Sequence, residues 1–226
     1  MERYSRHRNL YSESQFALIR KARVLVAGAG GLGSTVIQLL ARLGVGTIYI
    51  YDYANVDLPD LNRQILYEEN DIGKSKTLCA ASKISAINKE VKAIALPKKI
   101  DINISIPNVD VVFDCLDNFE ARFILDDILY KNQIPFIHGG INKYYAQVTS
   151  IVPGLSKTLS ELFPINSNDV DRNMSKDIFP PVATFAASIQ VSEGIKFITK
   201  QKDKMLINKV MMIDLLTNNF EIVDFK

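Results

Sequence analysis

The glycines of residues 28–33, which read GAGGLG, have the clearest potential for chemistry in this sequence. They follow the short apolar run of residues 23–27 and precede a segment whose apolar residues recur at helical spacing. Glycine lets the backbone turn tightly and approach a phosphate, and the first turn of a helix offers free N–H groups to an anion. We therefore predict that this turn binds a nucleotide, through Gly28, Gly30, Gly31 and Gly33.

A carboxylate follows at the distance expected for contact with a ribose. Asp52 stands 19 residues beyond Gly33, at the end of the next apolar run. Its oxygens can accept hydrogen bonds from ribose hydroxyls there. On these residues alone, an NAD-dependent oxidoreductase is the usual interpretation. A glycine-rich turn without a ligand is the structural alternative, although its position between a strand and a helix argues against it.

Two cations further along the chain favour a triphosphate over a dinucleotide. Residues 57–64 read DLPDLNRQ, and residues 71–76 read DIGKSK. Arg63 can hold two phosphate oxygens at once through its planar guanidinium, and Lys76 supplies a compact positive charge. A dehydrogenase needs neither residue at these positions. Lys74 is better explained as part of a solvated basic surface.

A second carboxylate is expected at the end of another apolar strand, within the segment DCLDN at residues 114–118. Ligands bind at the carboxyl ends of the strands in open α/β sheets, so Asp117 is well placed to hold a magnesium ion on the phosphates. Capping of the following helix is the alternative explanation, and it competes most strongly at Asn118. His7 and His138 are expected to be solvated or locally hydrogen-bonded.

Strands that alternate with helices must position these residues. Apolar runs indicate parallel strands, at residues 23–27, 47–51, 91–96, 109–115 and 134–138. Helical spacing lies between them, at residues 32–43, 74–88 and 118–131. We predict an α/β fold with a Rossmann-like, mostly parallel sheet and helices on both faces.

The C-terminal third changes in character after Gly140. An antiparallel strand, a helix and two closing strands are expected there, at residues 146–152, 181–199, 209–215 and 220–225. Residues 153–181 read as a long crossover loop with little periodicity, and loops of this length are usually functional or mobile. We expect a single domain with a nucleotide-binding half, residues 1–140, and a partner-binding half, residues 141–226.

Composition argues against several classes of function. The 27 basic and 25 acidic side chains leave a net charge of +2 in 226 residues, which is too balanced for a nucleic-acid-binding surface. The two cysteines, Cys79 and Cys115, form no Cys-x-x-Cys pair, and this suits a reducing compartment. The polar N-terminus and the lack of an apolar run of about 18 residues predict a cytoplasmic protein that does not enter a membrane.

Several short segments resemble the ThiF/MoeB/HesA family, the bacterial relatives of ubiquitin-activating enzymes. In order, they are the opening Arg-Tyr-Ser-Arg of residues 3–6, then GAGGLGS, LNRQ, DIGKSK and DCLDN, and the helical segment QVSEGIK of residues 190–196. Each segment alone is a weak signal. Their order and spacing together are specific, and the resemblance covers most of the chain.

The resemblance implies an ATP-dependent adenylyltransferase on a homodimeric scaffold. In such an enzyme the C-terminal carboxylate of a small ubiquitin-fold sulfur-carrier protein, or of a peptide, attacks the α-phosphate of ATP. Pyrophosphate leaves and an acyl-adenylate remains. The sequence does not identify the carrier, because thiamine, molybdopterin, tRNA thiolation and peptide-modifying pathways all use such activators.

The family's motifs assign roles to individual residues. Asp52 would bind the ribose, and the glycine turn would let the backbone approach the nucleotide. Arg63 and Lys76 would bind the phosphates, and Asp117 would hold Mg²⁺. Arg6 would reach the phosphates in the active site of the neighbouring subunit. The remaining ATP-binding candidates belong to the same motifs: Asn62, Gln64 and Asn118.

Two departures from the family's pattern concern cysteine. Many relatives bind zinc through two Cys-x-x-Cys pairs, which this chain lacks, so we expect no zinc. Some relatives use a cysteine of the crossover loop to form a thioester or an acyl-persulfide. Residues 153–181 contain no cysteine, so we expect no thioester on this chain. Cys79 and Cys115 are expected to be buried and structural.

A third departure lies beside the predicted phosphate ligands. Ala54 and Asp60 stand where the family usually has an aspartate and an asparagine. Asp60 puts a carboxylate next to phosphate-binding groups, which would weaken ATP binding. A catalytically degenerate dimeric scaffold is therefore an alternative function. An NAD-dependent oxidoreductase is the other, although it leaves Arg63 and Lys76 without a role.

Overall fold

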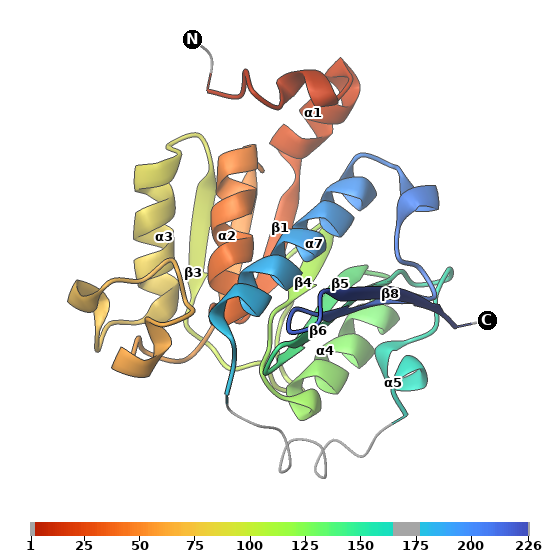
Figure 1. Ribbon diagram of the computed structural model, residues 1–226. Helices are drawn as coiled ribbons and strands as arrows, with labels where there is room; N and C mark the ends of the chain where they lie inside the picture. The colour runs from red at the N-terminus through yellow and green to blue at the C-terminus, as the bar shows by residue number, and fades with distance from the viewer. Residues whose placement is uncertain (1–2, 165–176, 226) are drawn as a thin grey trace.

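The computed structural model describes residues 3–164 and 177–225, which contain an eight-stranded sheet in the order β3-β2-β1-β4-β5-β6-β7-β8 (Figure 1). Its strands are β1 (Arg23–Ala27), β2 (Thr47–Tyr51), β3 (Lys92–Leu96), β4 (Val111–Asp114), β5 (Phe136–Asn142), β6 (Tyr145–Ile151), β7 (Lys209–Asp214) and β8 (Asn219–Asp224). The pairs from β3 to β5 are parallel, and those from β5 to β8 are antiparallel. The predicted fold class is confirmed.

Helices cover both faces of this sheet. They are α1 (Glu13–Lys21), α2 (Gly31–Leu43), α3 (Lys76–Ile87), α4 (Phe119–Lys131), α5 (Leu159–Leu162) and α7 (Pro180–Ile198). Short 3₁₀ turns occur at η1 (Arg8–Leu10), η2 (Leu58–Asp60), η3 (Glu69–Asp71) and η4 (Lys202–Lys204). Helices α2, α3 and α7 pack on one face, and α4 and α5 pack on the other (Figure 1).

Each face of the sheet holds its own hydrophobic core. Along β1, Val24 and Val26 belong to the core under α2 and α7, and Leu25 belongs to the core under α4. Successive side chains of a strand point to opposite faces, so a strand covered on both sides is apolar throughout. Helix α2 ends at Gly44, whose φ of +83° lets the chain turn back into β2.

The strand order reverses between β1 and β4. The chain moves outward from β1 to β2 and β3, and then returns to place β4 on the other side of β1. Loops that leave the carboxyl ends of two such strands diverge and leave a crevice, where ligands bind in open α/β sheets. The glycine turn follows β1 and the segment with Asp117 follows β4, so the fold brings both to this crevice.

Strand β5 is longer than the sequence predicted. The predicted end at His138 is wrong, because the strand continues through two glycines to Asn142 and pairs with β6 there. A Cβ on Gly139 would fall within 2.7 Å of the Gln190 side chain. Gln190 of α7 donates hydrogen bonds to the carbonyl oxygens of Asp114 and Ile137 at 2.8 and 3.0 Å. The glycine therefore admits a helix side chain to the sheet and does not break the strand.

Two helices of the described part of the chain were not predicted. Helix α1 begins with a capping box in which Ser12 and Gln15 satisfy each other's backbone N–H groups. Helix α5 lies inside the predicted crossover loop, where Leu159 and Leu162 enter the core under α4. The middle of that loop, residues 165–176, lies outside the described residues. Among the helices that are described, none is long and apolar enough to cross a membrane.

Candidate active site

The glycine turn contains glycines of two kinds. Gly28 has a φ of +95°, and a Cβ on it would lie 2.5 Å from the carbonyl oxygen of Cys115. A Cβ on Gly33 would overlap the carbonyl oxygen of Gly28, so the fold itself requires both of these glycines. A Cβ on Gly30 or Gly31 would meet its nearest neighbour at 3.7 or 3.5 Å, which is ordinary contact. Packing does not require these two glycines, because a methyl group would fit beside each of them at ordinary contact distance.

Asp52 lies directly beside this turn. Its Oδ2 accepts a hydrogen bond from the backbone N–H of Ala29 at 2.8 Å, and its Oδ1 accepts one from Ala54 at 2.8 Å. These bonds fix the orientation of the carboxylate at the end of β2. An ionised carboxylate has about four lone-pair sites, so both oxygens can also accept hydrogen bonds from ribose hydroxyls.

The two predicted phosphate ligands share an acidic partner. Asp60 Oδ2 lies 3.0 Å from Lys76 Nζ, and Asp60 Oδ1 lies 3.8 Å from Arg63 Nη2. The Lys76 side chain is only 10% exposed. Arg63 also adjoins the glycine turn, since its Cγ lies 3.6 Å from where a Cβ on Gly31 would stand. The structure thus brings both cations together next to the turn, and Lys74 is exposed, as predicted.

Asn62 and Gln64 flank Arg63 and hold its surroundings. Asn62 Oδ1 accepts a hydrogen bond from Arg63 Nη1 at 2.9 Å. Gln64 is 2% exposed and donates from Nε2 to Asp60 Oδ1 at 2.6 Å. Its Oε1 is buried and has no hydrogen-bond partner among the described residues. Buried acceptors are normally satisfied, so the contact of Gln64 with Asp60 leaves one of its polar atoms unpaired among the described residues.

Tyr67 is a site residue that the sequence did not reveal. Its hydroxyl donates a hydrogen bond to the carbonyl oxygen of Ala29 at 2.8 Å and lies 3.4 Å from the carbonyl oxygen of Lys76. The side chain is buried, and this burial raises the pKa of the hydroxyl, which therefore keeps its proton. Tyr67 ties the glycine turn to the first residue of α3. No sequence signal identifies it, because its partners are backbone carbonyls that only the fold brings together.

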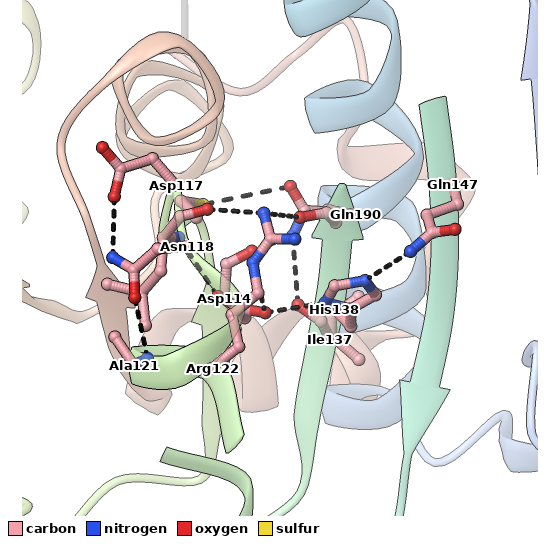
Figure 2. A network of polar contacts seen from close by, with 12 residues as sticks. Asp114, Asp117, Asn118, Ala121, Arg122, Ile137, His138, Gln147 and Gln190 are labelled. Atoms are coloured by element: carbon pink, nitrogen blue, oxygen red, sulfur yellow. Dashed lines mark hydrogen bonds and ion pairs between the residues drawn. The ribbon is translucent and has the colours of Figure 1, made fainter. Parts of the chain in front are cut away.

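Asp117 and Asn118 follow β4 and differ in what they contact. Asn118 caps α4, since its Oδ1 accepts a hydrogen bond from the N–H of Ala121 at 2.8 Å. Asp117 is exposed and accepts a hydrogen bond from Nδ2 of Asn118 at 3.0 Å. Its carboxylate points away from the buried groups behind it (Figure 2). The structure therefore shows the capping role for Asn118 and leaves Asp117 open to a ligand.

The donor chemistry of Asp117 suits Mg²⁺. Within residues 3–164 and 177–225, no three His, Cys, Asp or Glu side chains gather as a metal-binding cluster. Mg²⁺ does not require one, because it is usually held by one or two carboxylates together with substrate phosphates and waters. An exposed carboxylate at the carboxyl end of β4 meets that requirement.

A buried polar network lies behind Asp117 (Figure 2). His138 Nδ1 lies 2.7 Å from Asp114 Oδ2, and both side chains are completely buried. Gln147 Nε2 lies 3.1 Å from His138 Nε2. An amide nitrogen can only donate, so Nε2 of the imidazole accepts and Nδ1 donates to Asp114. Burial lowers the pKa of His138, which keeps the ring neutral.

Arg122 is the cation of this network and is 3% exposed. Its Nε lies 3.7 Å from Asp114 Oδ2, and its Nη2 donates to the carbonyl oxygens of Leu116 at 2.5 Å and Gly139 at 3.1 Å. Leu116 immediately precedes Asp117, so Arg122 holds the backbone that carries that carboxylate. Arg122 therefore fixes the position of Asp117 from the buried side of the site. The sequence does not reveal it, because an arginine within a helix usually indicates a solvated face.

Arg6 lies elsewhere in the molecule. It is exposed, and the nearby Tyr4 hydroxyl accepts a hydrogen bond from Asn88 Nδ2 at 2.9 Å and packs beside Gly44. Gly44 follows the last residue of α2, whereas the glycine turn lies at its first. The helix has 13 residues, which corresponds to about 20 Å at 1.5 Å per residue. The structure does not bring Arg6 together with the other predicted phosphate ligands of its own chain.

Both cysteines are buried, as predicted. Cys79 lies in α3 and Cys115 follows β4, and each is 7% exposed. Burial raises the pKa of both thiols. A thiol that keeps its proton is a poor nucleophile, because the thiolate is the reactive form.

The strand order reverses beside the glycine turn, and the carboxylate of Asp52 and the cations of Arg63 and Lys76 lie next to that turn. This arrangement defines a nucleotide-binding α/β enzyme. The resemblance seen in the short motifs extends over the whole chain. The model of the ThiF family matches residues 4–226, and the protein belongs to this family. Membership supports ATP as the nucleotide.

Relatives agree with this assignment. The SAMP-activating enzyme E1 of Haloferax volcanii is 30% identical over an alignment of 234 positions, gaps included. The alignment covers 100% of this chain and 86% of the relative. The sulfur carrier protein ThiS adenylyltransferase of Bacillus subtilis is 31% identical over 192 residues, which cover 81% of this chain and 56% of the relative. The protein is an adenylyltransferase, as predicted.

The fold is shared with a solved structure. MccB of E. coli, in a complex with AMPCPP and MccA, matches with a TM-score of 0.89 and 23% sequence identity. The match covers 99% of this chain and 71% of that one. Another structure of MccB contains ATP. The likeness establishes that the two chains share an architecture from the glycine turn to the antiparallel strands.

Proposed function

We propose that this protein uses ATP to adenylate the C-terminal carboxylate of a small ubiquitin-fold sulfur-carrier protein or of a peptide. The observation that carries the proposal is the grouping of Arg63 and Lys76 beside the open glycines and Asp52. A dinucleotide dehydrogenase does not need two cations there. The relatives are named for a SAMP, a ThiS sulfur carrier and, in a solved complex, MccA, which supports a protein or peptide as the acceptor.

In the proposed reaction, a carboxylate oxygen of the partner forms a bond to the α-phosphorus of ATP. The bond from that phosphorus to the bridging oxygen of the β-phosphate breaks, and pyrophosphate leaves. The nucleophile belongs to the partner, so this chain has to align two reactants and stabilise charge on the transferring group. That requirement explains why the site contains fixed carboxylates and cations and needs no activated serine or cysteine.

Each candidate residue has a task in this scheme. Asp52 accepts hydrogen bonds from the ribose, and the space beside Gly30 and Gly31 admits the nucleotide to the backbone. Arg63 and Lys76 bind the phosphates and stabilise the charge that develops on the leaving pyrophosphate. Asp117 would hold Mg²⁺, which neutralises phosphate charge when bound.

Arg6 has a task only if a second copy of the chain is present. It lies at the amino end of the strands, and the crevice lies at their carboxyl ends. A homodimer in which each subunit presents Arg6 to its partner's phosphates would make use of that separation. We therefore propose a homodimeric enzyme whose active sites are completed across the interface.

Adenylation is proposed to occur without a covalent thioester on this chain. The cysteines, Cys79 and Cys115, are buried, with pKa values raised by that burial. Thioester formation requires a thiolate that can reach the acyl-adenylate. The acyl-adenylate would instead be passed on directly to the next reactant.

ATP–pyrophosphate exchange tests the proposal. The assay contains Mg²⁺ and either a ubiquitin-fold protein ending in Gly-Gly, a short peptide with a free C-terminal carboxylate, or no acceptor. We expect exchange only with an acceptor, and a loss of about 10²- to 10³-fold in Asp117→Ala, by analogy with removal of one transition-state contact. Wild-type protein that binds NAD and not ATP would instead support an oxidoreductase. ATP binding without exchange for any acceptor would support a degenerate scaffold.

A further inference from the structure

The carboxylate of Asp60 occupies the position where phosphate oxygens are expected. It contacts Lys76 Nζ at 3.0 Å and Arg63 Nη2 at 3.8 Å. The same carboxylate accepts hydrogen bonds from Gln64 Nε2 at 2.6 Å and from the backbone N–H of Asp57 at 3.1 Å. These donors form an anion-binding set, and in this structure the anion is part of the protein.

The surroundings of Asp60 make this contact matter. The side chains of Asp60 and Lys76 are 14% and 10% exposed, so water screens them weakly. Without Asp60, neither the largely buried ammonium of Lys76 nor the guanidinium of Arg63 would keep an ion pair among the described residues. Burial of an unpaired charge is costly, and a carboxylate at this point removes that cost.

The carboxylate also hinders a ligand. A triphosphate carries several negative charges and would have to approach the same two cations at the same distances. Like charges at about 4 Å repel, and the repulsion grows as water is excluded. The phosphates and Asp60 therefore cannot both hold Lys76 and Arg63 at full strength.

We infer that Asp60 is an internal counter-ion that holds the phosphate-binding cations before ATP binds and is exchanged for the triphosphate of ATP. This inference rests on the proposed function. It makes Asp60 a residue that lowers nucleotide affinity while keeping the two cations in place before the nucleotide arrives. Asp60 is the last residue of the short 3₁₀ turn η2, and its carboxylate also accepts a hydrogen bond from the backbone N–H of Asp57 in the capping box of that turn.

The test measures ATP binding directly, by calorimetry, in the full-length protein. We expect the Kd for ATP to fall by about tenfold in Asp60→Asn, equivalent to about 1.4 kcal/mol. The amide removes the charge and keeps an acceptor for Gln64. Asp60→Glu, which keeps the charge, should bind ATP about as weakly as the wild type.

Asp57→Asn is the matched control. Asp57 lies three residues away and is exposed, and its carboxylate accepts hydrogen bonds from backbone N–H groups of η2, with no ion pair to either cation among the described residues. Asparagine keeps these hydrogen bonds, because it is an equally good N-cap residue. Asp57→Asn changes the net charge of the protein by the same amount as Asp60→Asn does. We expect no more than a twofold change in the Kd for ATP, so a larger change would mean that general charge, and not the contact of Asp60, sets the affinity.

Thermal unfolding gives a second readout, in which the rise of the Tm on addition of ATP is the part that a purely structural role would not change. Asp60→Asn should unfold at a lower temperature than wild type without ATP, because Lys76 loses its counter-charge. Its Tm should rise by more than that of wild type when saturating ATP is added, since ligand binding stabilises by mass action. If Asp60→Asn does not fold, Asp60→Ser offers a second neutral variant for the same measurements.

The outcomes separate three explanations. Tighter ATP binding by Asp60→Asn both with Mg²⁺ and with EDTA supports the counter-ion. Weaker binding only when Mg²⁺ is present would make Asp60 a metal ligand and would overturn the inference. An unchanged Kd would also overturn it. Wild-type protein that binds no ATP under any condition would contradict the proposed function itself, and so the two failures are distinguishable.

Discussion

At the scale of single residues, the glycine turn separates what the fold needs from what a ligand needs. Gly28 and Gly33 are required by contacts within the chain, and Gly30 and Gly31 are not. We predict that Gly30→Ala and Gly31→Ala change the free energy of unfolding by less than about 1 kcal/mol, since alanine fits without overlap. ATP affinity should nevertheless fall by at least tenfold, because a methyl group would occupy the space beside the turn.

The control for this prediction is Gly33→Ala, which adds the same methyl group where a Cβ overlaps the carbonyl oxygen of Gly28. We expect it to lower stability by about 1–3 kcal/mol, measured by urea unfolding, through strain in the turn. If Gly30→Ala and Gly31→Ala bound ATP as tightly as the wild type, the nucleotide would not approach the backbone at these glycines.

The sequence was most informative about residues whose partner is the ligand. Asp52, Arg63 and Lys76 were predicted because their charge and spacing fit a nucleotide, and the structure brings them together at the glycine turn. Tyr67 and Arg122 were missed because they reach backbone carbonyls that only the fold brings to them, that of Ala29 for Tyr67 and that of Gly139 for Arg122. No local pattern records which carbonyl a side chain will reach, so such positioning residues emerge only from the fold.

At the scale of elements, the alternation of strands and helices was predictable, and the exceptions have physical causes. The four residues of α5 are too few to show a helical period. The end of β5 was placed too early because Gly139 indicates a turn in isolation, whereas here it makes room for Gln190. The signal for α1 was present in the capping pair of Ser12 and Gln15 and was not used.

The buried carboxylate of Asp126 joins α4 to the first turn of α5. Asp126 Oδ2 accepts hydrogen bonds from the backbone N–H groups of Leu159 and Ser160 at 2.9 and 3.3 Å. The side chain is 2% exposed, and its Oδ1 has no partner among the described residues. Burial raises the pKa of Asp126 to about 6. The folded protein therefore holds this proton more tightly than the unfolded chain does.

The direction of this pKa shift determines how the stability of the protein depends on pH. A raised pKa contributes stability that is fully present below the unfolded value near 3.8 and is lost as the pH rises through about 6. We predict that Asp126→Asn removes this loss. Relative to wild type, the variant should gain stability between pH 4.5 and pH 7.5, measured from the midpoints of urea unfolding at both values.

Asp127→Asn serves as the comparison for Asp126→Asn. Asp127 is the adjacent residue of α4, and its side chain is 61% exposed and forms an ion pair with Lys131. A pair this exposed contributes little, so the variant should follow the wild type at both pH values. Equal behaviour of Asp126→Asn and Asp127→Asn would show that Asp126 is not desolvated enough to affect stability.

At the scale of the whole molecule, the sheet separates the N-terminal segment from the crevice. If Arg6 acts in the partner's active site, Arg6→Ala and Asp117→Ala should each lose at least 90% of ATP–pyrophosphate exchange when pure. A mixture of the two variants should recover up to about a quarter of wild-type activity, because half of the chains would pair as mixed dimers. Each mixed dimer would contain one active site with both residues intact.

A mixture that recovers nothing, measured after the subunits have been allowed to exchange, would contradict an active site shared between two chains. The control is a mixture of Lys76→Ala with Asp117→Ala. Both residues are proposed to act in the active site of their own chain. A mixed dimer of that pair contains no intact site and should stay inactive, so recovery by this mixture would show that mixing itself changes the assay.

The buried phenol of Tyr67 affects the entropy change when a nucleotide binds to the candidate site. It joins the carbonyl oxygen of Ala29 to that of Lys76, and so links the segment proposed for the nucleoside to the one proposed for the phosphates. The ring is rigid and almost fully covered, so the spacing of these two segments is set when the chain folds. The entropy of arranging these two segments is lost during folding. A nucleotide that fits their spacing therefore binds without a second loss of that entropy.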